Sequence, residues 1–267
     1  MKGPVLLAAG GIAAALAIGA AAAQAQRGAT PPRAPAPQTA SAYTGPRSPD
    51  RKPDLNGIWQ ALSTAHYNLE AHSAIEGVPA GLSVVEGGSI PYQPAALAKR
   101  NENFQNRLTA DPLRKCYLPG VPRATYLPFP FEITQTPTHI GIAYEFAHAT
   151  RTIFLDGTAH LEDLDFWMGD ARGRWEGDTL VVDTVSLGDR TWFDQAGNFH
   201  SDALKVVERF TPMDGSHIAY EVTFDDAKVF TRPWKINLVL YRRMEKNLEL
   251  LDYECAEHIY EKLFKKK

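Results

Sequence analysis

Apolar and polar residues alternate through the second half of the chain, with the period of two that is typical of β-strands. Short turns such as Pro137-Thr138 and Met213-Asp214-Gly215-Ser216 join several of these segments. Strands joined in sequence by short turns predict an all-β fold with one or two short helices, an antiparallel meander closed as a lipocalin-like barrel or folded as a β-sandwich. The predicted strands are Phe131–Thr136, His139–Phe146, Thr150–Leu155, Thr179–Leu187, Ala203–Thr211, His217–Phe224, Trp234–Arg243 and Leu248–Cys255.

The chain before these strands lacks the alternation. Asp54–Trp59 predicts a turn that leads into a short strand. Residues 61–93 are aperiodic and rich in Gly, Ser and other small residues, which predicts a long excursion over the surface or across a cavity mouth. Pro94–Leu108 predicts a helix, because proline suits the first turn and Ala and Lys dominate the segment. Asp111-Pro112 ends this helix.

The stretch GRWEGDTLVVDT, residues 173–184, combines aromatic, acidic and β-branched residues around a polar corner. Glu176-Gly177-Asp178 predicts a tight turn in which Gly177 is free to adopt a positive φ. The stretch is therefore predicted to be a hairpin rather than a catalytic motif. Asp183 is the exception, since an acid among β-branched residues needs a partner if it is buried.

The same stretch, with the following TWFDQAGNFHSDALKVVERF and TRPW, resembles a family of largely uncharacterised secreted bacterial proteins. The segments from Phe131 to Pro137 and from Tyr144 to His160 carry further motifs of that family. The resemblance covers most of the chain from Leu55 to Glu257. It implies export and brings no defined reaction.

Gly57-Ile58-Trp59, ahead of a β-meander, resembles the G-x-W start of lipocalin-type barrels. This resemblance implies a closed barrel. It also implies that an arginine late in the chain, Arg242 or Arg243, packs over Trp59.

The first 25 residues have the layout of a secretory signal peptide. Lys2 precedes 19 uncharged residues, Val5–Ala23, and Ala23-Gln24-Ala25 is an A-x-A cleavage site. A retained membrane anchor is the alternative, because 19 apolar residues just reach across a bilayer. The run is mostly Ala and Gly, which favours cleavage. We therefore expect a periplasmic or secreted protein with no stable membrane insertion after cleavage.

Composition divides the remaining chain. Residues 26–53 contain seven prolines and few large apolar side chains, and predict a disordered tether. Residues 54–260 suit a single barrel domain, and residues 261–267 form a basic tail. The formal net charge of −3 gives no electrostatic footprint for nucleic acid, so we expect none as a partner.

Cys116 and Cys255 are the only cysteines in the chain. An oxidising compartment favours a disulfide between them, and two free buried thiols are the alternative. The loop is long, so the chain-entropy model gives the bond about 4–5 kcal/mol.

Histidines and acids concentrate between Tyr144 and Arg209. His148, His160 and His200 are candidate proton carriers, because histidine titrates near neutral pH and a carboxylate partner fixes its tautomer. In an antiparallel meander the loops of His160 and His200 fall on the same rim, so these two histidines are the first candidates. The candidate orienting carboxylates are Asp165, Asp194 and Asp202.

The same region offers groups for holding a small molecule at a barrel mouth. Arg151 or Arg209 would bind an anionic group bidentately. The aromatic residues outnumber what short hairpins require, although core packing accounts for part of them. Those assigned to the walls of a site for an apolar or ring-shaped ligand are Tyr144, Trp167, Trp192 and Phe193.

These residues predict a cofactor-free enzyme that applies His/Asp acid–base chemistry to a small, partly apolar molecule, as a lyase, isomerase, hydratase or hydrolase. A non-catalytic barrel that binds a small ligand is the first alternative. A metal site formed by His148, His160 and His200 is the second, although no H-x-x-x-H or H-E-x-x-H motif supports it. Ser201 beside His200 is a weak candidate nucleophile, since neighbours on an extended chain point to opposite sides.

Overall fold

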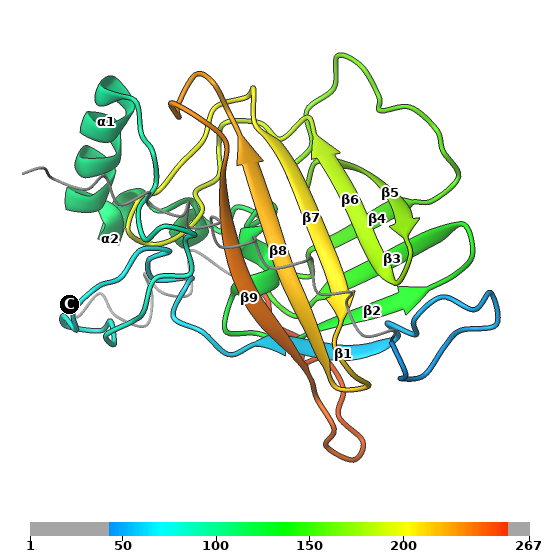
Figure 1. Ribbon diagram of the computed structural model, residues 1–267. Helices are drawn as coiled ribbons and strands as arrows, with labels where there is room; N and C mark the ends of the chain where they lie inside the picture. The colour runs from blue at the N-terminus through cyan, green and yellow to red at the C-terminus, as the bar shows by residue number, and fades with distance from the viewer. Residues whose placement is uncertain (1–42, 256–267) are drawn as a thin grey trace, which may run out of the picture. The chain divides into compact units, whose positions relative to one another are not determined.

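The structure is a computed structural model and describes residues 43–255. The predicted signal peptide, most of the predicted tether and the basic tail lie outside these residues. Within them, nine strands form one closed barrel in the order of the sequence, which confirms the all-β barrel (Figure 1). The strands are β1 (Gly57–Ala61), β2 (Phe131–Gln135), β3 (His139–Tyr144), β4 (Thr150–Phe154), β5 (Asp170–Glu176), β6 (Thr179–Val185), β7 (Lys205–Pro212), β8 (His217–Asp225) and β9 (Trp234–Arg242).

Short helices precede β2. They are α1 (Pro94–Gln105), α2 (Arg107–Ala110), the 3-10 helix η1 (Pro112–Lys115) and α3 (Arg123–Tyr126). α1 begins at the predicted proline, and Asp111 caps η1 by accepting a hydrogen bond from the Leu113 N–H. All four residues of α3 are buried.

The barrel closes where β1 pairs with β9, which excludes the sandwich. Trp59 lies opposite Arg242, and the guanidinium of Arg242 sits 4.4 Å from the Trp59 ring centroid. Arg242 also donates hydrogen bonds to the carbonyls of Gly215 and Asp54. Gly57 has φ of +120°, and a Cβ there would lie 2.7 Å from Arg242 Nη1. The predicted packing of a late arginine over Trp59 is confirmed for Arg242.

Two strand predictions need correction. β5 is not among the predicted strands, and it pairs in parallel with β4, so the meander is not antiparallel throughout. Segment 155–169 therefore crosses from one rim to the other. Leu248–Cys255 is not a strand and makes only an isolated bridge, Phe146 to Tyr253. Since β1 already occupies the edge of β9, the closed sheet leaves no edge for another strand.

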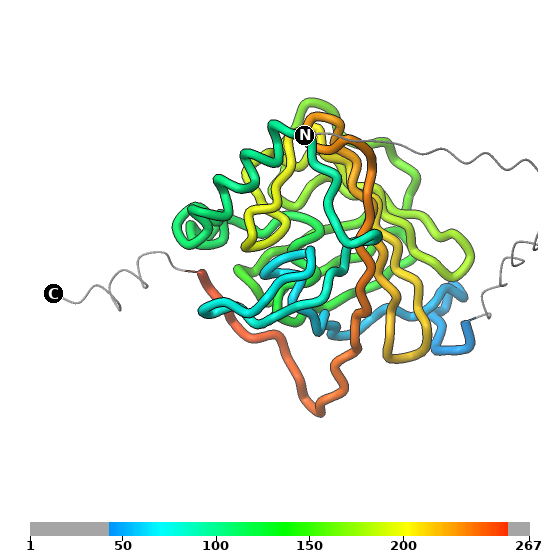
Figure 2. Tube along the Cα trace, turned by 60° about the vertical axis from the view of Figure 1, so that its left-hand side comes forward, coloured from blue at the N-terminus to red at the C-terminus, as the bar shows by residue number. Residues whose placement is uncertain are grey.

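The long connections gather at one rim, which we call the covered rim. It carries residues 62–130, 145–149, 186–204 and 226–233, with α1 and α2 on the left of Figure 1. The opposite rim carries tight turns, including the predicted one at Gly177, whose φ is +61°. Figure 2 shows the chain after β9, in orange and red, leaving the barrel in a projecting turn before it returns. The covered rim therefore carries the long loops that can form a site.

The described residues before the predicted domain boundary at Asp54 already pack on the barrel. Tyr43 is only 8 % exposed, and its N–H donates to the Asp178 carboxylate. Arg47 forms an ion pair with the same carboxylate at 2.7 Å. The proline-rich composition of the predicted tether did not reveal this anchor, because its acidic half lies 131 positions away in the β5–β6 turn.

The barrel interior is filled by side chains, and a charged pair crosses it. Arg151 on β4 forms two hydrogen bonds with Glu208 on β7, of 3.0 and 2.6 Å. Both side chains are at most 1 % exposed. Tyr220 donates to Glu208 at 2.7 Å and Arg151 donates to Thr184 at 3.1 Å. Large apolar residues such as Trp59, Phe131, Phe210 and Phe224 fill the space around them.

Replacing Glu208 with Gln should lower the free energy of unfolding by about 3–5 kcal/mol, because Arg151 keeps its charge in the interior without a counter-charge. Urea unfolding at pH 7 measures the change. Glu176→Gln is the matched control, since Glu176 pairs with Arg209 on the exposed outer face and its loss should not be measurable. Equal unfolding midpoints for the two variants would contradict the assignment.

Candidate functional site

Two adjoining cavities lie among the loops of the covered rim. The larger, of about 400 Å³, is lined by His66 and is called the His66 cavity. The smaller, of about 230 Å³, is lined by His72 and is called the His72 cavity. Tyr67 and Gln195 line both, so the two cavities are neighbours.

The segment predicted as an excursion across a cavity mouth supplies one side of both cavities. A turn brings the Tyr67 N–H to the Thr64 carbonyl at 2.9 Å. The Gln195 N–H then donates to the His66 carbonyl at 3.0 Å, which joins this segment to the β6–β7 connection. The backbone around His66 is thus held by hydrogen bonds on both sides.

His66 is 8 % exposed and lines the larger cavity. Burial, and after it the nearby charge of Arg123, lowers the pKa of His66 to about 4. Nδ1 is enclosed and has no hydrogen-bond partner among the described residues. At pH 7 the ring is therefore a neutral imidazole at the cavity.

The polar floor of the His66 cavity is a neutralised ion pair. Asp111 accepts two hydrogen bonds of 2.8 Å from the guanidinium of Arg123, and both side chains are at most 3 % exposed. Arg123 belongs to the buried helix α3. Asp111 therefore presents no free charge to the cavity, because Arg123 binds it bidentately.

Three aromatic rings form an apolar wall of the His66 cavity. The ring centroid of Phe129 lies 5.5 Å from that of Phe146 and 4.9 Å from that of Tyr253. Phe146 and Tyr253 stack at 5.4 Å. Tyr253 belongs to the segment that the disulfide between Cys116 and Cys255 attaches to η1, so the predicted disulfide is confirmed and supports this wall.

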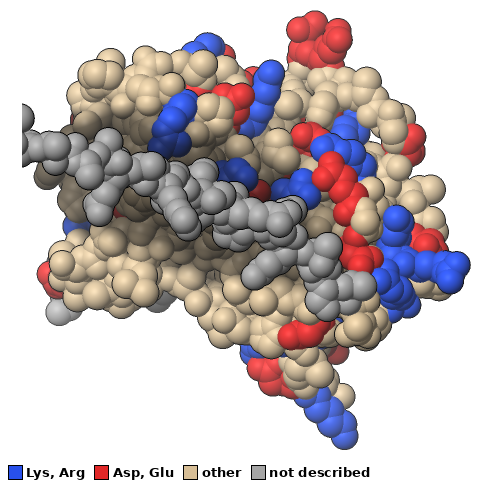
Figure 3. Space-filling model, viewed as in Figure 1, with Lys and Arg blue, Asp and Glu red and all other residues tan. Residues whose placement is uncertain are grey.

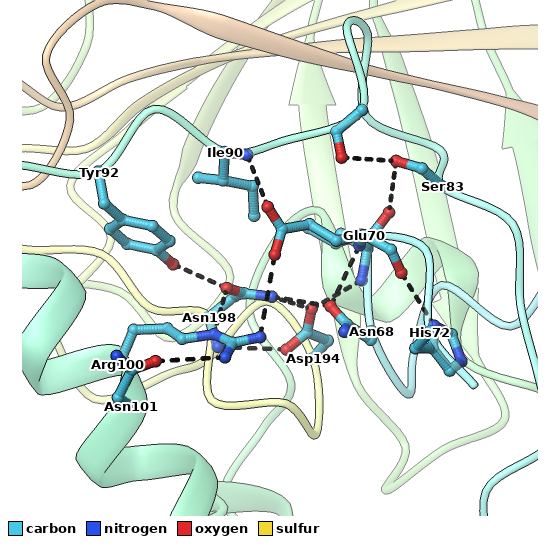
Figure 4. A network of polar contacts seen from close by, with 12 residues as sticks. Asn68, Glu70, His72, Ser83, Ile90, Tyr92, Arg100, Asn101, Asp194 and Asn198 are labelled. Carbon is cyan, nitrogen blue, oxygen red and sulfur yellow. Dashed lines mark hydrogen bonds and ion pairs between the residues drawn. The ribbon is translucent and has the colours of Figure 1, made fainter. Parts of the chain in front are cut away.

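A polar network holds the His72 cavity together (Figure 4). Buried Asp194 accepts hydrogen bonds from the Leu69 N–H at 2.9 Å and from the Asn198 amide at 2.6 Å. Asn198 in turn accepts from Tyr92 at 2.9 Å and from Arg100 of α1 at 3.2 Å. Burial raises the pKa of Asp194 to about 6. The network fastens segment 61–93 and α1 to the β6–β7 connection, and Asp194 is its centre.

The three predicted histidines lie in three different surroundings. His148 is exposed and pairs with Asp252 at 2.9 Å. His160 Nδ1 lies 2.8 Å from Asp170, at the start of β5, rather than next to a predicted acid. His200 is buried, where it contacts the Thr191 hydroxyl at 2.7 Å and the Ser201 carbonyl at 2.9 Å. His160 and His200 both reach the covered rim, yet they share no hydrogen-bond partner.

The other predicted polar residues already have structural partners, with one exception. Arg151 lies inside the barrel with Glu208, and Arg209 pairs with Glu176 on the outer face. Asp202 pairs with Lys228, and Asp165 is exposed. Asp183 faces outward and pairs with Arg174. On the face of the molecule in Figure 3, basic and acidic side chains lie next to one another rather than in a patch of one sign.

The predicted aromatic walls are packed against other parts of the protein. Tyr144 is buried in the barrel and contacts the Thr125 hydroxyl. Phe193 is 1 % exposed and packs on Phe224, while Trp192 is 9 % exposed. Trp167 lies between the ring of Tyr117 and the guanidinium of Arg190. None of these four lines the His66 cavity or the His72 cavity.

In residues 43–255 no group of three or more His, Cys, Asp or Glu side chains is arranged to hold a metal ion. No helix in this described part has the length and apolarity needed to cross a membrane. In comparisons with known proteins, no family model and no curated protein matches the chain.

Sequence reasoning missed His66, Tyr67, Asp111 and Gln195 as site residues. Each belongs to a segment without strand or helix periodicity, and each is distant in sequence from most of its neighbours in the cavity. The one available signal was the long aperiodic segment 61–93, which was assigned to a cavity mouth without naming a residue.

The two buried titrating groups should give opposite pH dependences. The pKa of His66 is about 4 when folded against 6.5 normally, so the unfolded chain binds more protons between these values and stability falls as the pH drops. The pKa of Asp194 is about 6 against 3.8, so the folded protein binds more protons and stability rises as the pH drops. The two slopes oppose each other in the unaltered protein.

Single variants should separate these slopes. Between pH 6.5 and pH 4, His66→Gln should gain roughly 3 kcal/mol relative to the unaltered protein, and Asp194→Asn should lose a similar amount. Urea unfolding across this range measures both differences, and all other titrating groups are common to the three proteins. Parallel stability profiles for all three would show that neither pKa is shifted as described.

Proposed function

We propose that the protein is an exported barrel, periplasmic or secreted, that binds a small, partly apolar, ring-containing molecule in the His66 cavity. The observation that carries the proposal is a neutral, largely buried histidine lining a cavity of about 400 Å³. Ligand cavities commonly have this size and combine apolar walls with a few polar groups. Here Phe129, Phe146 and Tyr253 supply the wall and His66 supplies the polar group.

Export is supported by the disulfide and by the signal-peptide layout. Disulfides persist in oxidising compartments and are rare in the cytosol. The Cys116–Cys255 bond joins positions 139 residues apart and closes the loop that contains most of the barrel.

Binding is favoured over acid–base catalysis at this cavity by the pKa values. An efficient general acid or base has a pKa near the working pH, whereas that of His66 is about 4. Asp194 has a pKa of about 6, yet it is 0 % exposed and its carboxylate is occupied by Leu69 and Asn198. Neither group combines a suitable pKa with access to a substrate.

An acid–base enzyme is the second candidate, at a different place. His160 lines an outer hollow of about 380 Å³, and Asp170 holds its Nδ1 at 2.8 Å. This is the arrangement by which a carboxylate orients a catalytic histidine. Asp170 also accepts hydrogen bonds from the Leu161 N–H and from Arg172, so its position is fixed.

The binding proposal predicts that the neutral aromatic probe 2-naphthamide binds with a stoichiometry of one. Gln195→Trp, which fills the boundary between the two cavities, should weaken binding at least about tenfold, because the probe loses its space. Val239→Trp on the outside of β9 adds similar bulk away from the cavity and should leave binding unchanged. Isothermal titration calorimetry at pH 7 measures all three proteins.

Absence of binding to the unaltered protein, or equal weakening by both tryptophan variants, would contradict the cavity as the site. His160→Gln removes the histidine of the second candidate site. It should leave 2-naphthamide binding unchanged, because His160 does not line the His66 cavity.

A further inference from the structure

The two cavities of the covered rim are lined by more positive than negative charge. Arg114 lines the His66 cavity, and Arg100 and Arg107 line the His72 cavity. Asp111 is the one acid among the described residues that line them, and Arg123 neutralises it. The whole chain carries a formal net charge of −3, so this local excess of arginine opposes the overall charge.

Among the described residues, Arg114 differs from the other two arginines in having no side-chain partner. Arg100 donates to Asn198, and Arg107 donates to the Phe104 carbonyl while lying over its ring. In residues 43–255 no hydrogen bond, ion pair or ring contact engages the guanidinium of Arg114, which is exposed at the cavity. Its planar set of N–H donors is therefore available to a ligand.

The backbone that carries Arg114 is held on both sides. It belongs to η1, which Asp111 caps at its start through the Leu113 N–H at 3.1 Å. Cys116 ends η1 and is bonded to Cys255, so the disulfide fixes this segment next to Tyr253. The two segments that carry Arg114 and the Tyr253 ring are thus joined by a covalent bond.

We propose that the ligand of the His66 cavity is an anion, with a carboxylate joined to an apolar ring. The ring lies against Phe129, Phe146 and Tyr253, and the carboxylate binds Arg114 at the mouth. A guanidinium matches the planar carboxylate with two parallel hydrogen bonds. Because His66 is neutral and Asp111 is already paired, no charge within the cavity opposes the anion. This inference rests on the proposed binding function and specifies the class of ligand.

The test compares 2-naphthoate with 2-naphthamide, which have the same ring and differ in charge. At pH 7 and low salt, 2-naphthoate should bind the unaltered protein about fivefold more tightly, the upper range for an exposed ion pair. Arg114→Gln should remove this preference without changing the affinity for 2-naphthamide. Lys115→Gln is the matched control, because Lys115 is the next residue of η1 and does not line the cavity.

Each outcome decides a separate question. Loss of the preference in Arg114→Gln alone, with weaker binding of 2-naphthoate at high salt, supports the assignment. Equal affinity of the two probes, or equal effects of the Arg114 and Lys115 variants, overturns the anion class while the cavity stands. Failure of both probes to bind overturns the cavity itself.

Discussion

The ion pair between Arg151 and Glu208 occupies the centre of the barrel, and the remaining structure is built around it. It joins β4 to β7 across the interior, at side chains that are at most 1 % exposed. A buried pair is tolerated only when its geometry is good and its remaining hydrogen-bonding groups are satisfied. Here two hydrogen bonds join the partners, and Tyr220 and Thr184 complete the cluster. Because side chains of the described residues fill its centre in this way, the barrel supports the surrounding loops and does not enclose a ligand cavity of its own.

The filled interior directs function to the covered rim, and α3 connects the two regions. Thr125 of α3 contacts the hydroxyl of Tyr144, which projects into the barrel from β3. Two residues earlier, Arg123 binds Asp111 on the floor of the His66 cavity and lowers the pKa of His66. α3 therefore contacts the barrel wall through Thr125 and the cavity floor through Arg123. A site built this way inherits the rigidity of the closed sheet although its residues lie on loops.

The alternation of apolar and polar residues, with the turn residues, predicted most of the strands. Closure of the barrel explains why the prediction failed at Leu248–Cys255. Seven of the eight predicted strands correspond to observed ones within two residues, because alternating burial leaves a local pattern. β5 reads DARGRWE, in which charged residues hide the period. The segment Leu248–Cys255 has strand composition, but pairing of β1 with β9 removes the edge it would need. Closure is a tertiary property, so the alternation within each segment carried no sign of it, and only the G-x-W resemblance at Gly57-Ile58-Trp59 implied it.

The candidate site was less predictable, because its chemistry arises from burial. Nothing near His66 in the sequence marks it, and its lowered pKa follows from the burial that the surrounding loops provide. The more conspicuous residues, Arg151 and His200, are satisfied by Glu208 and Thr191.

One covalent bond makes the candidate site sensitive to redox conditions. The Cys116–Cys255 disulfide fixes the aromatic wall at Tyr253 and the segment of Arg114 together, so a reducing compartment would release both sides of the cavity at once. The two sides of the cavity that carry Arg114 and Tyr253 are thus held together only while this disulfide is intact.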